Sequence, residues 1–439
     1  MNIAQLKEAV VSGAYDSAFI SLYGDNTSID KVKTRYLDAI DNFSALYGSE
    51  ISEDRDVGLF SVPGRSEISG NHTDHNHGKV LAASISLDII AVAAKTDKNI
   101  IRVKSEGFDE DTVSLEDVKT VVPEEKYKAS AIIRGMCDGF LSRGRKIGGF
   151  AAYTTSNVLK GSGLSSSAAF EVMIGNILNH LYNDGEENAV EIAKIAQYSE
   201  NKHFGKPCGL MDQTACAVGG FVAIDFKDPA NPVVEKIPFD LSAAGLSLCI
   251  VNTGGNHADL NEDYASVPAD MKKAAEFLGV QFLAETNKKA LLASAREMRE
   301  KIGDRCFLRA LHFFDENERV ANQKEALSKG DISAFLSGVR ESGLSSATKL
   351  QNIFTVKNVN EQGLTVALAL AGEILDGVPD SAYRVHGGGF AGTIQAFVPA
   401  ELVAKFTDML EGVFGDGNVY VLSVRKYGAV SLEALKQQK

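Results

Sequence analysis

The chain has 439 residues, more than one compact core usually supports, so two domains are expected. Its 44% hydrophobic and 23% charged residues are the balance of an ordinary globular protein, which argues against a fibrous or disordered chain. The formal net charge of −13 disfavours nonspecific binding to nucleic acid or to an anionic membrane, so neither is expected as a partner.

Cysteine use and the N-terminus indicate a cytoplasmic protein. The five cysteines include no CxxC pair, which argues against a disulfide framework or a zinc ribbon. Lys7, Glu8 and Asp16 stand where a signal peptide needs an apolar run, and no stretch reaches the roughly 18 apolar residues of a membrane span. We therefore expect a cytoplasmic localisation.

In the first half of the chain, helical patterns alternate with strand patterns. Apolar residues at helical spacing predict amphipathic helices over residues 1–48. From Val57 the runs become short, β-branched and bounded by glycine and proline, which predicts strands at VGLFSVPGR and KVLAASISLDIIAVAA. Further helices are expected at 167–183 and 186–202, and further strands at 219–226 and 246–252.

The second half continues the mixture. Helical patterns fill roughly 267–302, 305–329 and 357–376, and a glycine-rich turn at 387–392 leads into the strand TIQAFV. The chain closes with the strand-like VYVLSV and a short polar tail. The interleaving predicts an α+β fold. A loop rich in Asp, Asn and Pro near residues 226–245 suggests domains over 1–235 and 236–439, with residues 1–48 as a helical extension of the first.

One segment has the composition of a phosphate-binding loop: Gly161, Ser162, Gly163, Leu164, Ser165, Ser166 and Ser167 directly precede an apolar helical run. Such a loop can bring successive backbone N–H groups to an anion at a helix N-terminus, and a serine hydroxyl can reach a metal bound to the phosphates. It is not a Walker A loop, since no Gly-Lys-Ser/Thr follows. A flexible turn with serine caps remains the alternative.

Three other segments are rich in groups that can carry chemistry. Residues 63–78, PGRSEISGNHTDHNHG, are dense in donors and acceptors that suit a hydroxyl-rich ligand such as a sugar. A zinc site is disfavoured there because His and Asp ligands so close in sequence cannot easily surround one ion. A purely structural polar turn remains an alternative. Glu200 and Asp212 can supply the metal-binding and acceptor-side carboxylates of phosphoryl transfer. The glycines of 387–392 indicate close backbone approach or a tight hairpin.

Together and in this order, these segments resemble the galactokinases of the galactokinase/homoserine/mevalonate/phosphomevalonate kinase superfamily. GRSEISGNHTDHNHG is similar to the signature GRVNLIGEHTDYNGG, and residues 161–168 follow the superfamily phosphate loop GxGLSSSA. Residues 207–213 differ from the family's PCGIMDQ by one Ile-to-Leu change, and GGGFAG at 387–392 stands for GGGFGG. The resemblance covers about residues 40–430.

The resemblance implies a two-domain kinase fold, with an N-terminal mixed α/β domain, a C-terminal ferredoxin-like α+β domain and the active site in the cleft between them. Residues 161–167 would then surround the phosphates of ATP, and Ser167 and Glu200 would hold Mg²⁺. Asp212 would accept the proton of the sugar's anomeric hydroxyl beside Arg65, a cation that keeps it ionised. Sugar contacts would come from Asn71, His72, Thr73, Asp74, Gly209 and Tyr264.

The implied reaction is transfer of the ATP γ-phosphate to galactose, giving α-D-galactose 1-phosphate, by a monomer or weak homodimer. Asn71 stands where the family has Glu, a residue expected at the sugar's 6-hydroxyl. We expect this exchange to remove a negative charge and so to stop repelling a C6 carboxylate. Galacturonate or N-acetylgalactosamine is therefore an alternative substrate. A catalytically silent sugar sensor is a third possibility, against which Arg65, Glu200 and Asp212 argue.

Overall fold

The computed structural model describes residues 1–24, 27–52, 54–158, 163–206, 208–255 and 260–437. In these residues, eight strands form a larger sheet in the order β12-β1-β2-β5-β3-β4, with β6 beside β2 and β7 beside β6. Four more form a smaller antiparallel sheet in the order β11-β8-β10-β9. The chain is therefore α+β with two sheets, as expected.

The strands of the larger sheet are β1 (Val57–Ser69), β2 (Lys79–Lys95), β3 (Ile100–Ser105), β4 (Glu110–Ser114), β5 (Phe150–Ser156), β6 (Phe221–Asp225), β7 (Val233–Ile237) and β12 (Val430–Ser431). Those of the smaller sheet are β8 (Leu246–Asn252), β9 (Ala382–His386), β10 (Thr393–Pro399) and β11 (Val419–Leu422).

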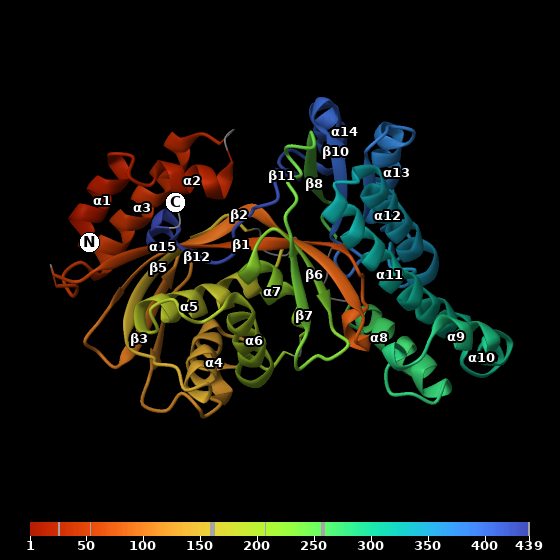
Figure 1. Ribbon diagram of the computed structural model, residues 1–439, viewed down its shortest axis with the longest axis horizontal. Coiled ribbons are helices and arrows are strands. Elements are labelled where there is room, and N and C mark those ends of the chain that lie inside the picture. Colours follow the sequence, from red (N-terminus) through yellow and green to blue (C-terminus); the bar gives the residue numbers. More distant parts are fainter. Residues whose placement is uncertain (25–26, 53, 159–162, 207, 256–259, 438–439) are drawn as a thin grey trace.

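Helices cover both faces of the larger sheet, and Figure 1 shows them in two groups on either side of β1 and β2. One group is α1 (Ile3–Val11), α2 (Asp16–Tyr23) and α3 (Ile29–Tyr47), and the other is α4 (Ala129–Ser142), α5 (Ser166–Tyr182), α6 (Ala189–Ser199) and α7 (Met211–Val218). Successive strand residues point to opposite faces, so Leu59 packs with α1–α3 while Phe60 packs with α4–α7. The helices expected over 1–48 are confirmed, and they cover one face of the sheet.

The helices of the second part of the chain are α8 (Asn261–Phe277), α9 (Lys288–Ala293), α10 (Ala295–Ile302), α11 (Asp304–Lys329), α12 (Ile332–Ser345), α13 (Gly363–Leu375) and α14 (Val403–Phe414). Of these, α13 and α14 pack on the smaller sheet, while α8, α9 and α10 pack with α11 in a separate apolar core. The single pattern expected over 267–302 is thus three helices. Phe335 of α12 packs edge-to-face against Phe221 of β6 and Phe397 of β10, so one apolar core joins the two sheets.

The end of the chain returns to the larger sheet. β12 pairs with β1, and α15 (Leu432–Gln437) packs beside the N-terminal helices, as both termini in Figure 1 indicate. The boundary expected between residues 235 and 236 falls inside β7, which pairs with β6; where the two parts divide stays a prediction. Among the residues described above, no helix is long and apolar enough to span a membrane.

Candidate functional site

The site is built first on an irregular stretch of β1. The pairing of β1 with β2 shifts register between Pro63 and Arg65 and again between Glu67 and Ser69. Proline has no N–H for the ladder, and bulges of this kind turn side chains in new directions, often next to active sites. Arg65 and Glu67 are both buried here, although each carries a charged group.

The phosphate-loop segment lies directly against this stretch. A Cβ on Gly64 would stand 2.8 Å from the carbonyl oxygen of Leu164, and the same oxygen accepts a hydrogen bond of 3.1 Å from the Arg65 N–H. Only a glycine at position 64 permits this approach. Ser165 has a positive φ of 58° just before α5 begins at Ser166. Of the expected phosphate-binding residues, Gly161 and Ser162 lie outside the described residues.

Arg65 and Asp212 form a two-pronged ion pair. The Arg65 Nε donates to Asp212 Oδ1 and an Nη donates to Oδ2, each at 2.8 Å. The other Arg65 Nη donates to the carbonyl oxygen of Gly163, and the Ser165 hydroxyl donates to Asp212. Asp212 lies in the first turn of α7, where a carboxylate also meets the positive end of the helix. The structure therefore brings the expected arginine and aspartate together at the phosphate loop.

The pKa values of this pair favour two charges. Burial by itself raises the pKa of Asp212, but the adjacent Arg65 charge, with the hydrogen bonds from Arg65 and Ser165, holds it below its ordinary value. Burial likewise works against the Arg65 cation, and Asp212 outweighs it, so that the pKa of Arg65 is raised. At neutral pH, Asp212 is a carboxylate.

A second carboxylate group lies beside Asp212. The Gln213 amide donates to both Glu171 Oε2 and Glu200 Oε2 at 3.0 Å, and Lys206 Nζ lies 3.8 Å from Glu200 Oε1. Glu200 begins a π-helical turn, η3 (Glu200–Phe204), a feature that recurs at functional sites. Burial, then the neighbouring Glu200, raises the pKa of Glu171 well above its ordinary value. The sequence patterns missed Glu171, whose only signal is an acidic residue on the buried face of a helix.

This group fits a divalent cation that keeps other ligands. Glu171 Oε1 and Gln213 Oε1 are buried oxygens without a hydrogen-bond partner, and oxygen atoms are the ligands of Mg²⁺. Ser167, expected as a ligand, lies one helical turn before Glu171 on α5. The described residues hold no group of three or more His, Cys, Asp or Glu able to bind a metal unaided. Mg²⁺ is usually held by one or two carboxylates with waters and substrate phosphates, so this donor set is sufficient.

The expected sugar-binding residues gather at the glycine loop that precedes β10. Asn71 Nδ2 donates to the Gly387 oxygen at 2.7 Å, and the Tyr264 hydroxyl donates to the Gly389 oxygen at 3.0 Å. Between them, His72 Nε2 lies 3.0 Å from the Gly388 oxygen. The glycines are needed for this packing, because a Cβ on Gly388 would come within 2.5 Å of the Tyr264 ring. Residues from both parts of the chain thus meet at one loop.

Three more expected residues lie beside this group in different roles. Asp74 and Gly209 are in contact, since a Cβ on Gly209 would collide with the Asp74 carboxylate. Thr73 is fully buried, and its hydroxyl contacts the carbonyl oxygens of Gly70 and Lys79, which makes it a turn-forming residue. Burial lowers the pKa of His72, so its imidazole is neutral at pH 7.

The expectation that Asn71 removes a negative charge from this corner is wrong. Asn71 Nδ2 donates to Glu67 Oε1 at 2.7 Å, so a carboxyl group lies directly beside the amide. Asn352, which no sequence pattern singled out, donates to Asn71 Oδ1 at 2.8 Å. Burial raises the pKa of Glu67 to about 7, against the Arg384 and Arg65 charges that lower it. The carboxyl group is therefore present, but it belongs to residue 67, in contact with position 71 where the resemblance placed it.

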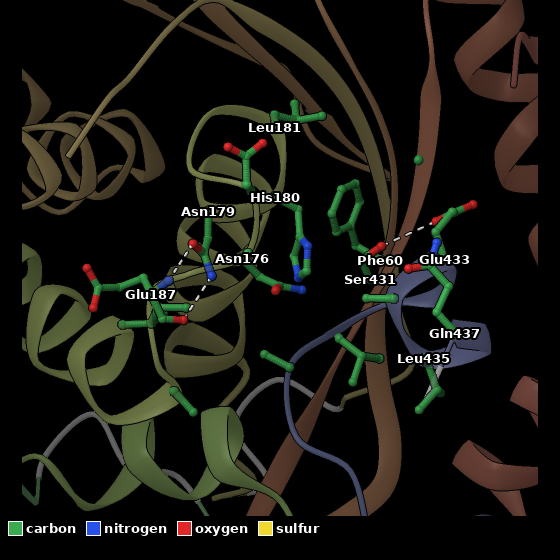
Figure 2. A pocket seen from close by; sticks show the side chains of 18 of the residues that line it. Phe60, Asn176, Asn179, His180, Leu181, Glu187, Ser431, Glu433, Leu435 and Gln437 are labelled. Carbon is green, nitrogen blue, oxygen red and sulfur yellow. Dashed lines mark hydrogen bonds between the residues drawn. The ribbon is translucent and has the colours of Figure 1, made fainter. Parts of the chain in front are cut away.

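Another hollow, of about 650 Å³, lies at the C-terminal half of α5 (Figure 2). Asn176 and His180 of α5 line it together with Phe60 of β1 and Glu433 of α15. Burial lowers the pKa of His180, so the ring is neutral. None of the residues expected in the site lines this hollow, which separates it from the Arg65–Asp212 pair.

Comparison with known proteins agrees with this geometry. Residues 130–220 match the family described as GHMP kinases N terminal domain, and residues 41–95 match the galactokinase galactose-binding signature. A Streptomyces coelicolor galactokinase is 32% identical over 379 residues, which is 85% of this chain and 92% of that protein. A Streptomyces lividans galactokinase is also 32% identical, over 80% of this chain and 84% of its own length.

Solved structures share the fold. A Lactococcus lactis galactokinase complexed with galactose superposes with a TM-score of 0.72 at 22% identity, covering 89% of this chain and 99% of that one. A Methanococcus jannaschii mevalonate kinase superposes with a TM-score of 0.60 at 14% identity, over 84% of this chain and 98% of its own. With curated relatives at this identity over most of its length, and with the Arg65–Asp212 pair at its phosphate loop, the chain belongs to the galactokinase family of the GHMP kinases.

Proposed function

We propose that this protein transfers the γ-phosphoryl group of ATP to the anomeric hydroxyl of galactose, giving α-D-galactose 1-phosphate and ADP. The observation that carries the proposal is the Arg65–Asp212 pair, which is bound to Gly163 and Ser165 of the phosphate loop. Phosphoryl transfer needs charge stabilisation and positioning more than covalent help from the protein. A guanidinium and a carboxylate fixed beside bound phosphates supply both.

In this proposal Asp212 orients the acceptor hydroxyl and takes up its proton. Arg65 keeps Asp212 ionised and stabilises negative charge on the transferring group. The Ser165 hydroxyl now shares the Asp212 carboxylate, so an arriving sugar hydroxyl joins or replaces that hydrogen bond. Residues 161–167 and the N-terminus of α5 bind the phosphates of ATP through backbone N–H groups and the helix dipole.

We further propose that Ser167 and Glu200 hold Mg²⁺, with Glu171 behind them. When bound there, Mg²⁺ would neutralise charge on the phosphates of ATP. Lys206 and Gln213 fix the orientation of Glu200 through its two carboxylate oxygens. On the sugar side we assign contacts to His72, Asp74, Gly209 and Tyr264.

All five cysteines are free, which supports the proposal that the reaction takes place in the reducing cytoplasm.

The test is an ADP-release assay with galactose, galacturonate, N-acetylgalactosamine and glucose as acceptors. We expect turnover with galactose and its 1-phosphate as product. Asp212→Asn keeps the size of the side chain but removes the charge, and it should lower kcat by about 10²–10⁴-fold. Asp109→Asn, an exposed exchange of the same kind, is the matched control. Full activity of folded Asp212→Asn, or no turnover of galactose by the unaltered protein, would refute the proposal.

A further inference from the structure

The side chains of Glu67 and Asn71 form a closed hydrogen-bonded unit beneath the glycine loop. Asn71 Nδ2 has two hydrogens, and both are used: one is donated to Glu67 Oε1 and one to the Gly387 oxygen, each at 2.7 Å. Asn71 Oδ1 accepts from Asn352 Nδ2, which also donates to the Gly388 oxygen at 3.1 Å. Asn71 is only 1% exposed, so its amide has no donor left for a sugar hydroxyl.

Glu67 also has its partners within the protein. Its Oε1 atom accepts from the Asn71 amide and lies 3.7 Å from Arg384 Nη2. Arg384 Nη2 is buried and has no hydrogen-bond partner, and Glu67, together with the more distant Glu316, favours its positive charge. The Glu67 carbonyl oxygen also accepts from the Gln395 amide of β10 at 2.9 Å. Glu67 therefore ties β1 to β9 and β10 directly below the loop.

The two residue types are exchanged relative to the signature GRVNLIGEHTDYNGG. That signature has Asn at the position of Glu67 and Glu at the position of Asn71, so the amide and the carboxylate have traded places. With the two residue types exchanged, positions 67 and 71 still carry one amide that can donate and one carboxylate, and the combined length of the two side chains is the same. A pair in direct contact can be inverted in this way without leaving a buried polar group unpaired, whereas one exchange alone cannot.

We propose that Glu67 and Asn71 are a reciprocal carboxylate–amide pair that positions the Gly387–Gly389 loop for the sugar, and that neither residue can be exchanged without the other. Asn71 acts through the loop and is not itself a ligand of the sugar. Asn71→Glu alone would set two carboxyl groups against each other in a buried place and would remove the donor to Gly387. Glu67→Asn alone would remove the carboxyl group that is paired with the buried Arg384 guanidinium. The kinetic part of this proposal rests on the proposed function.

The experiment is a cycle of four proteins: unaltered, Glu67→Asn, Asn71→Glu and the double variant. KM for galactose, KM for ATP and kcat are measured for each, together with urea unfolding. Each single change should raise the galactose KM by about ten- to a hundredfold, the range that an unsatisfied buried polar group produces. The ATP KM should stay near that of the unaltered protein. The double variant should recover most of the lost galactose affinity and most of the lost stability.

Two further results decide the outcome. Glu67→Gln keeps an acceptor for Asn71, so it should harm the galactose KM less than Glu67→Asn; a merely structural role would move the galactose and ATP KM values together. The proposal is refuted if Asn71→Glu alone binds galactose normally. It is also refuted if the galactose KM and the stability of the double variant are no better than those of the worse single variant. Should galactose not be phosphorylated at all, the proposed function fails, while the unfolding cycle still tests the coupling without any substrate.

Discussion

Asp212 and Glu171 are carboxyl groups of one site whose environments move their pKa values in opposite directions. Burial disfavours charge on both. The Arg65 guanidinium lies beside Asp212, and its charge outweighs the effect of burial, so Asp212 stays ionised. For Glu171, burial and the like charge of Glu200 outweigh the Gln213 amide and the Lys206 charge, so its pKa rises. Such a division within one site places a carboxyl group that ionises readily beside one whose ionisation is disfavoured.

Glu171→Gln is predicted to change how stability depends on pH in the ligand-free protein. Because the folded-state pKa of Glu171 is raised, its stabilising contribution is complete below the ordinary glutamate pKa and is lost as pH rises through the folded-state pKa. Gln imitates the protonated acid at every pH. The unfolding free energy of the variant, relative to the unaltered protein, should therefore increase between pH 5 and pH 8 in urea titrations without Mg²⁺.

The matched control for this experiment is Glu124→Gln, since Glu124 is exposed and lies outside the site. Its stability relative to the unaltered protein should not change over the same pH range. An equally flat profile for Glu171→Gln would contradict the assignment of a raised pKa to this residue.

Single residues of the site were predictable where a motif carried them. Arg65 and Asp212 came from the resemblance, and the structure brings them together as expected. Glu67, Glu171 and Asn352 were missed, because their importance arises from partners far away in sequence. Asn352, for example, meets Asn71 across 281 positions. No local pattern shows that one buried amide holds another.

At the scale of elements, glycines set how closely the loops of the site approach one another. Gly209 lies in the loop between η3 and α7, and its missing side chain leaves room for the Asp74 carboxylate of η1 (Asp74–Asn76). Gly64 makes the same kind of room between β1 and the phosphate loop. Two contacts therefore fix the elements that carry the sugar-side and phosphate-side groups.

Gly209→Ala is predicted to weaken sugar binding selectively. The new methyl group would collide with the Asp74 carboxylate and push it from its position, while φ at residue 209 is one that alanine can adopt. We expect the galactose KM to rise about tenfold or more, the cost of overpacking a close contact, with the ATP KM nearly unchanged. Gly412→Ala, on the exposed side of α14 with open space around it, is the control. Equal galactose KM values for the two variants would contradict the role given to this contact.

The sequence patterns predicted many of the helices and strands, but α4, α12 and α14 were missed. Residues 131–140 of α4 are buried without a break, Arg134 and Asp138 included, so burial in this helix does not follow the polarity of its residues. α12 contains glycines that lower helix propensity but allow close packing: a Cβ on Gly338 would meet Gln323, and one on Gly343 would meet Arg384. Tertiary packing outweighs local preference in both helices.

At the scale of the whole molecule, Asp88 of β2 joins three separate regions. Its buried carboxylate accepts from Tyr23 of α2, from Arg35 of α3 and from Arg425 of the returning C-terminal segment, at 2.6, 2.6 and 3.1 Å. Ser61 of β1 donates to it as well. The return of the chain to β1 was not predictable, because it depends on these distant partners and on a strand too short to show a pattern.

Asp88→Asn should therefore destabilise the whole protein. The variant leaves the fully buried Arg425, and Arg35 beside it, without a compensating charge, which we expect to lower the unfolding free energy at pH 7 by about 3–5 kcal/mol. Burial raises the pKa of Asp88, but Arg35 and Arg425 bring it below its ordinary value. Its contribution is therefore present above the ordinary aspartate pKa and is lost as pH falls through the folded-state pKa, so the difference between the two proteins should shrink in acid. Urea unfolding from pH 7 down to pH 3, with Asp109→Asn as the exposed control, measures this, and a loss below about 1 kcal/mol at pH 7 would show that Asp88 does not join these regions.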